Sequence, residues 1–484
     1  MNLDALFSIG LQNRGSEVVT GLTADSRKVR PGFVFAALKG VAADGQAYIP
    51  QALENGATAI LTDRATDTGS AALILDPEPR LALAKAAARF YPDQPGTMVA
   101  ITGTNGKSST VDFLRQIWRH AGLQAASMGT LGAVAPSGAI DLGHTTPDPV
   151  AIHHTLHTLA GQGVTHCAME ASSHGLDQYR LDGVRLGAVA FTNFTQDHLD
   201  YHPTMAAYRG AKLRLFRALA PPGAPAIINA DSPEREPFEE AARTAGLDPF
   251  SVGWRGTDLK IAELMPRATG QTLFLNHRSA EKTVDLPLVG EFQALNALTA
   301  AGLALALGTP FETVVSALSA LEPVKGRLEF VGETTGGAGV FVDYAHTPDG
   351  LDVLLRAARP HTAGRLVVVF GCGGDRDRGK RPLMGEIAAR QADIAIITDD
   401  NPRSEPPATI RAAIRAAAPD ALEIGDRGEA IGHAVAMLEP GDTLLIAGKG
   451  HETGQIVGDQ IIAFSDQDTA LAALAARKQR ESAP

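Results

Sequence analysis

Short apolar runs and stretches with helical spacing alternate along the chain. In its first part, turn residues separate three apolar runs, which lie at residues 32–38, 57–61 and 71–75. An alanine-rich pattern with helical spacing follows at 81–90, and the segment 91–96 contains two prolines and a glycine, which is typical of a linker. We therefore expect a first domain over residues 1–95.

The second part opens with the apolar run 98–101, which predicts a short buried strand. Apolar residues then recur at helical spacing, at Val111, Leu114, Ile117, Trp118 and Ala121. Further strand-like runs alternate with helical patterns and lie at 165–169, 188–192 and 226–229. This alternation predicts a largely parallel α/β sheet in a second domain over residues 96–326.

The third part repeats the alternation. Its strand-like runs lie at 340–344, 366–370, 394–398 and 443–447. Polar and charged residues follow each run, at the carboxyl ends where parallel sheets carry their working loops. We expect a third domain with a Rossmann-like fold over residues 327–484.

Composition narrows the class of protein. The net charge of −11 argues against nucleic acid as a partner, because such proteins use basic surface to displace counterions. Cys167 and Cys372 are too few for a disulfide framework or a cysteine-rich zinc site. The first residues, Met-Asn-Leu-Asp, show neither the basic region nor the apolar stretch of a signal peptide, and no run approaches the ~18 apolar residues of a membrane span, so we expect neither segment. We expect a cytoplasmic protein that does not insert into membranes.

The strongest local motif is Thr-Gly-Thr-Asn-Gly-Lys-Ser-Ser at residues 102–109, between a predicted strand and helix. Its glycines allow backbone N–H groups to face phosphate oxygens at a helix N-terminus. Lys107 suits the terminal phosphates of ATP, and the Ser108 hydroxyl suits Mg²⁺. Ile101 stands where the general P-loop has its first glycine, so the loop is a shortened form. The predicted ATP-binding residues are Gly103, Thr104, Asn105, Gly106, Lys107, Ser108 and Ser109.

Further motifs follow in order along the chain, at 170–176, 197–202, 211–216, 296–297, 326–329 and 343–348. Together with the shortened loop, this ordered set resembles the Mur ligases and their folylpolyglutamate synthetase relatives over nearly the whole chain. The resemblance implies an α/β protein of three domains. The central domain would be a P-loop-type parallel-sheet ATPase domain, and the C-terminal domain would be Rossmann-like.

The resemblance also implies a catalytic and metal-binding set. The catalytic residues would be Lys107, Glu170, His198 and Lys212. Oxygen atoms of Ser108 and Glu170 suit Mg²⁺, which prefers hard ligands. The resemblance alone places His198 beside a second metal ion, and it alone implies that Lys212 carries a carbamate that bridges to Mg²⁺. The predicted metal ligands are therefore Ser108, Glu170, His198 and carbamylated Lys212.

Three more residues match positions that contact ATP in the family. The resemblance places Asn296 near the base, Arg327 near the phosphates and Asp343 near the ribose. Each residue type is also common as a cap, a surface charge or a turn residue, so its spacing alone does not establish the role.

A UDP-sugar peptide is the first substrate that the resemblance implies. Ser26 and the loop 40–45 look like segments that bind a uridine nucleotide, and the apolar side chains in this loop limit contacts there to the backbone. Hydroxyl, amide and guanidinium groups suit the sugar, the peptide and its charged groups. The predicted residues are Ser26, Val41, Ala42, Ala43, Thr145, Thr146, Ser172, Gln178 and Arg180.

The incoming amino acid is predicted to be meso-diaminopimelate. The segment 400–403, Asp-Asn-Pro-Arg, resembles the motif of family members that add this amino acid. The planar fork of Arg403 suits its distal carboxylate, which L-lysine lacks. Arg376 is a second candidate for that carboxylate, and Gly448 and Glu452 for the distal ammonium. The predicted set is Arg376, Asp400, Asn401, Pro402, Arg403, Gly448 and Glu452.

The resulting hypothesis is an ATP-dependent amide ligase of peptidoglycan precursor synthesis. It would join meso-diaminopimelate to the D-glutamate γ-carboxylate of UDP-N-acetylmuramoyl-L-alanyl-D-glutamate through an acyl phosphate, and we expect a monomer. One alternative is another ligase of this type, adding L-lysine or alanyl-alanine or resembling folylpolyglutamate synthetase. The other is a P-loop NTPase without ligase activity.

Three histidines at 153, 154 and 157 invite a zinc interpretation. The Glu of the His-Glu-x-x-His pattern is missing, and metal sites need further matched ligands. We therefore expect these histidines to lie on an exposed helix face.

Overall fold

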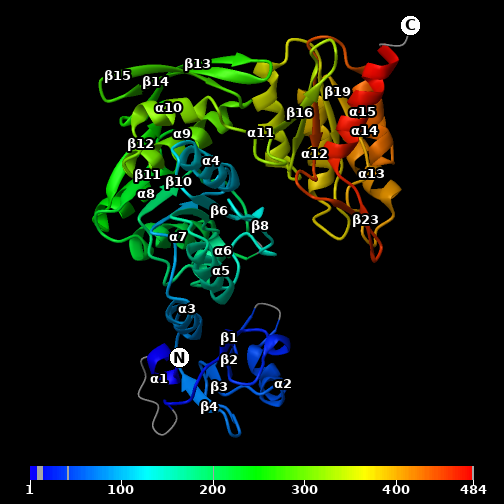
Figure 1. Cartoon of the computed structure of the whole chain (residues 1–484). Helices are drawn as coiled ribbons and strands as arrows, with labels where there is room; N and C mark the ends of the chain where they lie inside the picture. Colours follow the sequence, from blue (N-terminus) through cyan, green and yellow to red (C-terminus); the bar gives the residue numbers. More distant parts are fainter. Residues whose placement is uncertain (8–14, 41–42, 200, 482–484) are drawn as a thin grey trace. The chain divides into compact units, whose positions relative to one another are not determined.

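The computed structural model describes residues 1–7, 15–40, 43–199 and 201–481 (Figure 1). The chain forms two compact units. The first comprises Met1–Asp258 with Thr299–Val314, and the second comprises Leu259–Leu298 with Val315–Pro484. The domain boundaries expected at 95/96 and 326/327 stay predictions. Within the described ranges, every helix is too short or too polar to cross a lipid bilayer.

The N-terminal part of the first unit is built on a four-stranded parallel sheet of order β1-β2-β3-β4. The strands are β1 (Gly21–Thr23), β2 (Phe33–Ala36), β3 (Ala59–Thr62) and β4 (Ala72–Leu75). The helices are α1 (Leu3–Phe7), α2 (Ile49–Glu54) and α3 (Pro79–Phe90). Val34, Leu61 and Ile74 pack against Leu83 of α3 in one apolar core. The three apolar runs noted in the sequence overlap β2, β3 and β4, whereas β1, only three residues long, gave no such run.

The rest of the first unit is a larger sheet of order β12-β11-β10-β5-β9-β6-β7-β8. Its parallel strands are β5 (Thr97–Thr102), β6 (Ala125–Gly129), β9 (His166–Glu170), β10 (Ala188–Phe191), β11 (Pro225–Asn229) and β12 (Asp248–Gly253). The antiparallel strands β7 (Gly132–Ala135) and β8 (Gly138–Ile140) extend one edge. Its main helices are α4 (Lys107–His120), α5 (Pro149–Gly161), α6 (Ser173–Asp177), α7 (Met205–Arg214) and α8 (Arg235–Thr244).

The central strands of this sheet end at the same level. Ile101 of β5 lies opposite Glu170, the last residue of β9, and Thr102 lies opposite Phe191, the last residue of β10. Parallel pairing with this register brings the loops that follow the three strands to one edge. The shortened phosphate loop, the segment after Glu170 and the segment after Phe191 therefore meet.

The second unit contains a sheet of order β16-β17-β21-β18-β19-β20. Its strands are β16 (Glu329–Glu333), β17 (Gly339–Asp343), β18 (Leu366–Phe370), β19 (Ile394–Ile397), β20 (Leu422–Glu423) and β21 (Thr443–Ala447). All are parallel except β16, which pairs antiparallel with β17. Its helices are α11 (Pro348–Ala358), α12 (Lys380–Gln391), α13 (Pro407–Arg415), α14 (Arg427–Met437) and α15 (Asp466–Glu481).

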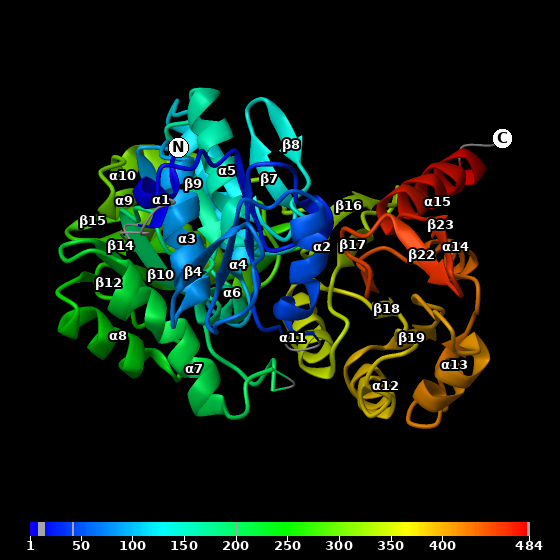
Figure 2. The same ribbon diagram turned by 90° about the horizontal axis from the view of Figure 1, so that it is seen from below.

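Helices cover both faces of this sheet, as the prediction of a Rossmann-like fold requires. Val368 and Phe370 share a core with residues of α11, α12 and α13, whereas Val367 and Val369 share another with α14 and α15. Figure 2 shows these two helix groups on opposite sides of β18 and β19. Burial on both faces explains why the strand reads as a continuous apolar run.

Two antiparallel pieces of the second unit were not predicted. One is the ribbon β13 (Leu259–Arg267), β14 (Gly270–His277) and β15 (Ala280–Leu286), and the other is the hairpin of β22 (Gly454–Val457) and β23 (Gln460–Ala463). Their apolar runs are short, as at Leu273–Leu275 of β14 and Ile461–Ala463 of β23, and most of their other residues are polar or exposed, so they do not stand out as buried strands. The chain enters the second unit at β13, leaves it within α9 (Glu291–Ala306) and re-enters it within α10 (Phe311–Leu318).

Candidate active site

The phosphate loop is held in a conformation that only glycine permits. Gly103 has φ +155°, and a Cβ there would lie 1.9 Å from Thr192 Oγ1. Gly106, with φ +84°, occupies the left-handed region directly before α4. Lys107, Ser108 and Ser109 form the first turn of α4, so this helix N-terminus faces the loop.

The segment after β10 clamps this loop. Asn193 accepts hydrogen bonds from Thr104 N through its carbonyl and from Asn105 N through Oδ1, both at 2.9 Å. Thr192 Oγ1 donates to Asn105 O at 2.6 Å. The sequence did not single out Thr192 and Asn193 as site residues, although Thr192 ends the predicted strand-like run 188–192 and Asn193 follows it; that this strand pairs with β5 is seen only in the structure.

Two lysines converge on the carbonyl of Gly103. Lys107 Nζ donates to Gly103 O at 2.9 Å and to Thr104 O at 2.8 Å, and Lys212 Nζ donates to Gly103 O at 2.6 Å. Lys212 comes from α7, is 1% exposed and lies 4.5 Å above the Tyr208 ring. Burial, and then the charge of Lys107, lowers the pKa of Lys212 well below that of an ordinary lysine. A neutral amine is the form that combines with CO₂, so this environment suits the predicted carbamate.

Oxygen atoms gather around Glu170. Its Oε1 accepts from Ser108 Oγ at 2.9 Å and from Thr130 N at 2.8 Å. The Thr130 and Thr145 hydroxyls are hydrogen-bonded at 3.0 Å, and a Cβ on Gly129 would lie 2.0 Å from Glu170 Oε1. A buried carboxylate among hydroxyls fits the oxygen chemistry of Mg²⁺. Thr130 was missed, and Thr145, predicted as a substrate residue, joins this group.

His198 belongs to an aromatic group beside α7. It has φ +53°, its ring lies edge-on to His174 at 4.9 Å, and its side chain is 42% exposed. Among the described residues, no three His, Cys, Asp or Glu side chains are placed to hold a metal together. The structure thus brings Ser108 and Glu170 together, while the metal-binding roles of His198 and Lys212 stay predictions.

Four predicted substrate residues form one connected group at α6. Thr146 Oγ1 donates to Glu170 O at 3.0 Å and accepts from Ser172 N at 3.2 Å. Arg180 donates to Thr146 O at 2.6 Å and to Gln178 Oε1 at 2.8 Å. Thr146 is 2% exposed, and its hydroxyl makes hydrogen bonds within the protein. Gln178 and Arg180 are only partly buried.

Arg80 of α3 adds a second cation that sequence reasoning missed. Its Nη2 donates to Lys39 O at 2.6 Å, and its Nη1 lies 3.5 Å from Gln178 Oε1. Burial, and then the charge of Arg80, lowers the pKa of Arg180. Two guanidinium groups next to one amide suit an anionic ligand such as a diphosphate or a carboxylate.

The predicted uridine loops are only partly described. Ser26 is buried, and its Oγ donates to Gln51 Oε1 at 2.6 Å. Ala43 is exposed, and its carbonyl accepts from Gly40 N at 2.8 Å. Val41 and Ala42 lie outside the described residues.

The three remaining ATP-binding candidates lie in the second unit and are linked there. Asn296 donates to Gln293 Oε1 at 3.1 Å, and Gln293 donates to Arg327 O at 2.9 Å. The Arg327 guanidinium lies 4.7 Å above the Tyr344 ring. Asp343 accepts from Leu328 N at 2.6 Å, and burial raises the pKa of its carboxyl. These contacts position the segment before β16 and leave the nucleotide roles as predictions.

The Asp-Asn-Pro-Arg loop after β19 has an unusual backbone. Asn401 and Arg403 have φ +45° and +50°, in the left-handed region that costs non-glycine residues free energy. The loop after β18 packs so closely that a Cβ on Gly374 would lie 1.8 Å from Pro402 O. Arg403 Nη1 donates to Gly374 O at 2.9 Å, which joins the two loops.

An ion pair missed in the sequence holds the loop that carries Arg376. Glu405 accepts from Asp375 N at 2.7 Å and from Arg381 Nη2 at 2.9 Å, and the Arg381 side chain is 3% exposed. Arg376, the next residue after Asp375, is exposed at this edge of the sheet. The predicted amino-acid-binding arginines therefore stand on loops that buried charges hold in place.

Gly448 and Glu452 also lie beside this loop. Gly448 has φ +122°, and a Cβ there would lie 2.4 Å from Asp400 Oδ2. Asn401 Nδ2 donates to Glu452 Oε2 at 2.8 Å. The structure thus groups Asp400, Asn401, Gly448 and Glu452, as the prediction required, although their contact with an amino acid stays a prediction.

The expectation for the three helix histidines is wrong for one of them. His153 of α5 is 2% exposed, and its Nε2 is hydrogen-bonded to Asp182 O at 3.0 Å. Burial lowers its pKa, which favours the neutral ring. His154 is exposed and His157 is partly exposed, as expected.

Comparisons with known proteins identify the family of the chain. Three domain families match the chain: "Mur ligase family, catalytic domain" at residues 18–95, "Mur ligase middle domain" at 101–304 and "Mur ligase, glutamate ligase domain" at 326–450. The chain belongs to the Mur ligase family. The enzyme class is therefore that of the ATP-dependent amide-bond-forming ligases.

Relatives match this Mur ligase over almost its full length. The UDP-N-acetylmuramoyl-L-alanyl-D-glutamate–2,6-diaminopimelate ligase of Mesorhizobium japonicum is 54% identical over 95% of both chains. The ligase of the same name from Caulobacter vibrioides is 53% identical over 94% of this chain and 96% of its own.

Solved structures confirm the predicted fold class. A diaminopimelate ligase of that name has a TM-score of 0.75 and 32% identity, with 99% of both chains covered. A MurF ligase from Thermotoga maritima, solved in complex with ADP, has a TM-score of 0.64 and 19% identity, with 96% of this chain and 99% of its own covered. The second likeness supports the shared α/β architecture alone.

ATP-dependent turnover of this Mur ligase should require Lys107. We expect Lys107→Ala to lower kcat by at least about 100-fold, because the charge nearest the phosphate loop is removed. Circular dichroism should be unchanged, and Lys85→Ala, an exposed lysine of α3, is the matched control. Near-normal turnover of Lys107→Ala would exclude the assigned ATP site.

Lys212 should carry a carbamate in the active enzyme. NMR with ¹³C-labelled bicarbonate is expected to give a carbamate signal that disappears in Lys212→Ala. That variant should lose most activity, and a small carboxylic acid should restore part of it by supplying the missing anion. A free amine alone in fully active enzyme would contradict the prediction.

Proposed function

We propose that this Mur ligase adds meso-diaminopimelate to the D-glutamate γ-carboxylate of UDP-N-acetylmuramoyl-L-alanyl-D-glutamate, with ATP, in peptidoglycan precursor synthesis. The observation that carries the proposal is the grouping of Asn401, Arg403 and Glu452 at one sheet edge. Near-full-length identity of 54% to a ligase of that name supports the same substrates. The expected monomeric state and cytoplasmic location belong to the proposal as well.

The first chemical step converts a poor electrophile into a good one. A γ-carboxylate oxygen attacks the γ-phosphorus of ATP, the bond to the β-phosphate oxygen breaks, and ADP leaves. The acyl phosphate now carries phosphate as its leaving group. Lys107 donates hydrogen bonds to the carbonyls of Gly103 and Thr104. It can exchange these two acceptors for phosphate oxygens when ATP binds.

The second step forms the amide. The α-amine of the amino acid attacks the acyl carbon, a tetrahedral intermediate forms, and phosphate departs while the nitrogen loses its proton. When bound at Ser108 and Glu170, Mg²⁺ supplies charge neutralisation at the phosphate oxygens. Carbamylated Lys212 would present an anion beside the phosphate loop, where it can hold the reacting groups in line.

Selection of the amino acid rests on one carboxylate. Diaminopimelate and L-lysine differ only in the carboxylate at the distal carbon, so discrimination needs a cation with fixed geometry. Arg403 meets this requirement because Gly374 O holds its guanidinium at 2.9 Å. Bound L-lysine would leave Arg403 without a carboxylate partner. The free-energy cost of that unpaired charge is enough for a preference of ~10³-fold for diaminopimelate over L-lysine.

The alternatives predict different products. A lysine-adding ligase would release phosphate with L-lysine, and an NTPase would release it without any UDP-sugar peptide. The Asp-Asn-Pro-Arg loop favours the diaminopimelate-adding ligase over the first alternative. The near-full-length ligase relatives argue against the second.

A phosphate-release assay separates these functions. The assay contains ATP, the UDP-N-acetylmuramoyl-dipeptide and one amino acid from a panel. We expect turnover only when that amino acid is meso-diaminopimelate. Omission of the dipeptide substrate should abolish phosphate release, because the acyl phosphate then cannot form. Equal rates with L-lysine, or release without the dipeptide, would refute the proposal.

Replacement of Arg403 should act on the amino acid specifically. We expect Arg403→Ala to raise the KM for diaminopimelate by ~100-fold or more, and Arg403→Lys to restore little, since an ammonium lacks the planar fork. The control is Arg415→Ala on α13, which removes an exposed ion pair with Glu423. This variant should have wild-type kinetics. An unchanged KM for diaminopimelate in Arg403→Ala would show that Arg403 does not bind the amino acid.

A further inference from the structure

A lysine that no motif assignment used is completely buried next to the Asp-Asn-Pro-Arg loop. Lys449 has 0% exposure and follows Gly448 at the end of β21. Burial of an ammonium group is costly unless oxygen atoms replace its water. A fully buried lysine is therefore stable only where its ammonium group contacts oxygen atoms.

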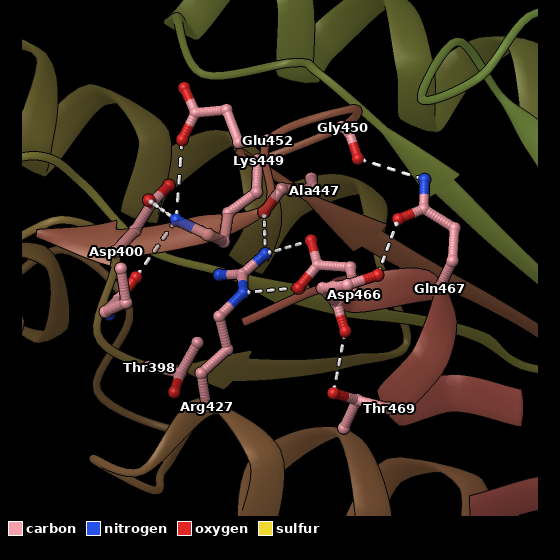
Figure 3. Close-up of polar contacts among 12 residues, drawn as sticks. Thr398, Asp400, Arg427, Ala447, Lys449, Gly450, Glu452, Asp466, Gln467 and Thr469 are labelled. Carbon is pink, nitrogen blue, oxygen red and sulfur yellow. Dashed lines mark hydrogen bonds and ion pairs between the residues drawn. The ribbon is translucent and has the colours of Figure 1, made fainter. Parts of the chain in front are cut away.

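Four oxygen atoms surround Lys449 Nζ. Asn401 Oδ1 and Gln455 Oε1 each accept a hydrogen bond at 3.0 Å. The carboxylates of Glu452 and Asp400 lie at 3.4 and 3.6 Å. Figure 3 shows the Lys449 side chain reaching between Asp400 and Glu452. One cation thus contacts three of the seven predicted diaminopimelate residues.

The same lysine joins three separate segments. Asn401 belongs to the loop after β19, Glu452 to the turn after β21, and Gln455 to the hairpin strand β22. Gln455 Oε1 also accepts from Asn401 N at 3.2 Å, and Asn401 Oδ1 accepts from Ile456 N at 2.9 Å. Without the ammonium, two carboxylates and two amide oxygens would face one another with no cation between them.

A second buried pair holds the strand end from the other side. Arg427 donates to both oxygens of Asp466, at 2.7 and 2.8 Å, and to Ala447 O at 2.9 Å. Both side chains are at most 2% exposed, and Figure 3 places Arg427 between Asp466 and Ala447. Ala447 precedes Gly448 and Lys449, so the backbone that carries the lysine cannot shift freely.

We propose that Lys449 is a positioning residue that fixes Asn401 and Glu452 in their amino-acid-binding geometry and thereby sets the affinity for the incoming diamino acid. This inference rests on the proposed function. Lys449 itself does not contact the amino acid; its ammonium neutralises and orients the groups that do. The left-handed backbone of Asn401 persists because these contacts over-determine it.

The test is steady-state kinetics of Lys449→Met, which keeps the length of the side chain and removes its donors. We expect the KM for meso-diaminopimelate to rise at least ~10-fold, because the loop must be ordered at the moment of binding. The kcat at saturation should change less than ~3-fold, and the KM for ATP should stay unchanged. Wild-type turnover of diaminopimelate in the same assay tests the proposed function separately.

Asp442→Asn is the matched control. Asp442 pairs with Arg365 at 2.6 Å at the opposite end of β21, and its side chain is 2% exposed. This variant should lower the melting temperature without raising the KM for the amino acid. An equal KM increase in the control, or an unchanged KM in folded Lys449→Met, would overturn the assignment.

A second variant keeps the test decisive if Lys449→Met does not fold. Gln455→Leu removes one acceptor of Lys449 from the partly exposed hairpin and leaves the lysine in place. We expect a ~3-fold rise in the KM for diaminopimelate with kcat retained. A wild-type KM in Gln455→Leu would contradict the positioning role.

Discussion

The level ends of parallel strands are the constraint on which both candidate sites depend. In the first unit, Thr102 and Phe191 end their strands side by side, and in the second unit Asp343 lies opposite Ala447 and Phe370 opposite Ile397. This register brings loops from distant parts of the sequence to one edge of each sheet. Without it, the phosphate loop would lack its clamp and the Asp-Asn-Pro-Arg loop its neighbours.

At both edges, lysine side chains meet backbone or side-chain oxygens. Lys107 and Lys212 share Gly103 O, whereas Lys449 is surrounded by side-chain oxygens. The difference in hydrogen-bond partners fits two different roles, phosphate binding and the positioning of substrate-binding residues. A lysine on loop carbonyls can transfer its hydrogen bonds to phosphate oxygens, but Lys449 would lose stabilising contacts if it moved, so it suits a fixed frame for substrate binding.

The buried strands and the phosphate loop could be predicted because they depend on local sequence, whereas the carbamate, the second metal site and the substrate residues were predicted only through the family resemblance. Apolar runs identified the buried strands, and the glycines at 103 and 106 identified the phosphate loop. The residues that were missed, Thr130, Asn193 and Arg80, act through contacts between segments far apart in the sequence. No spacing rule reveals such pairs before the strand order is known. The antiparallel ribbon β13–β15 was missed because polar residues dominate β13 and β15 and the apolar run in β14 is only three residues long.

The proposed function depends on one reaction, the formation of an amide bond to meso-diaminopimelate. The most direct test is mass spectrometry of the product formed when the enzyme, ATP and the UDP-N-acetylmuramoyl-dipeptide compete for equimolar meso-diaminopimelate and L-lysine. We expect a nucleotide-linked tripeptide that carries diaminopimelate, with ADP and phosphate in equal amounts. A product that carries lysine, or ATP hydrolysis without a new amide, would contradict it.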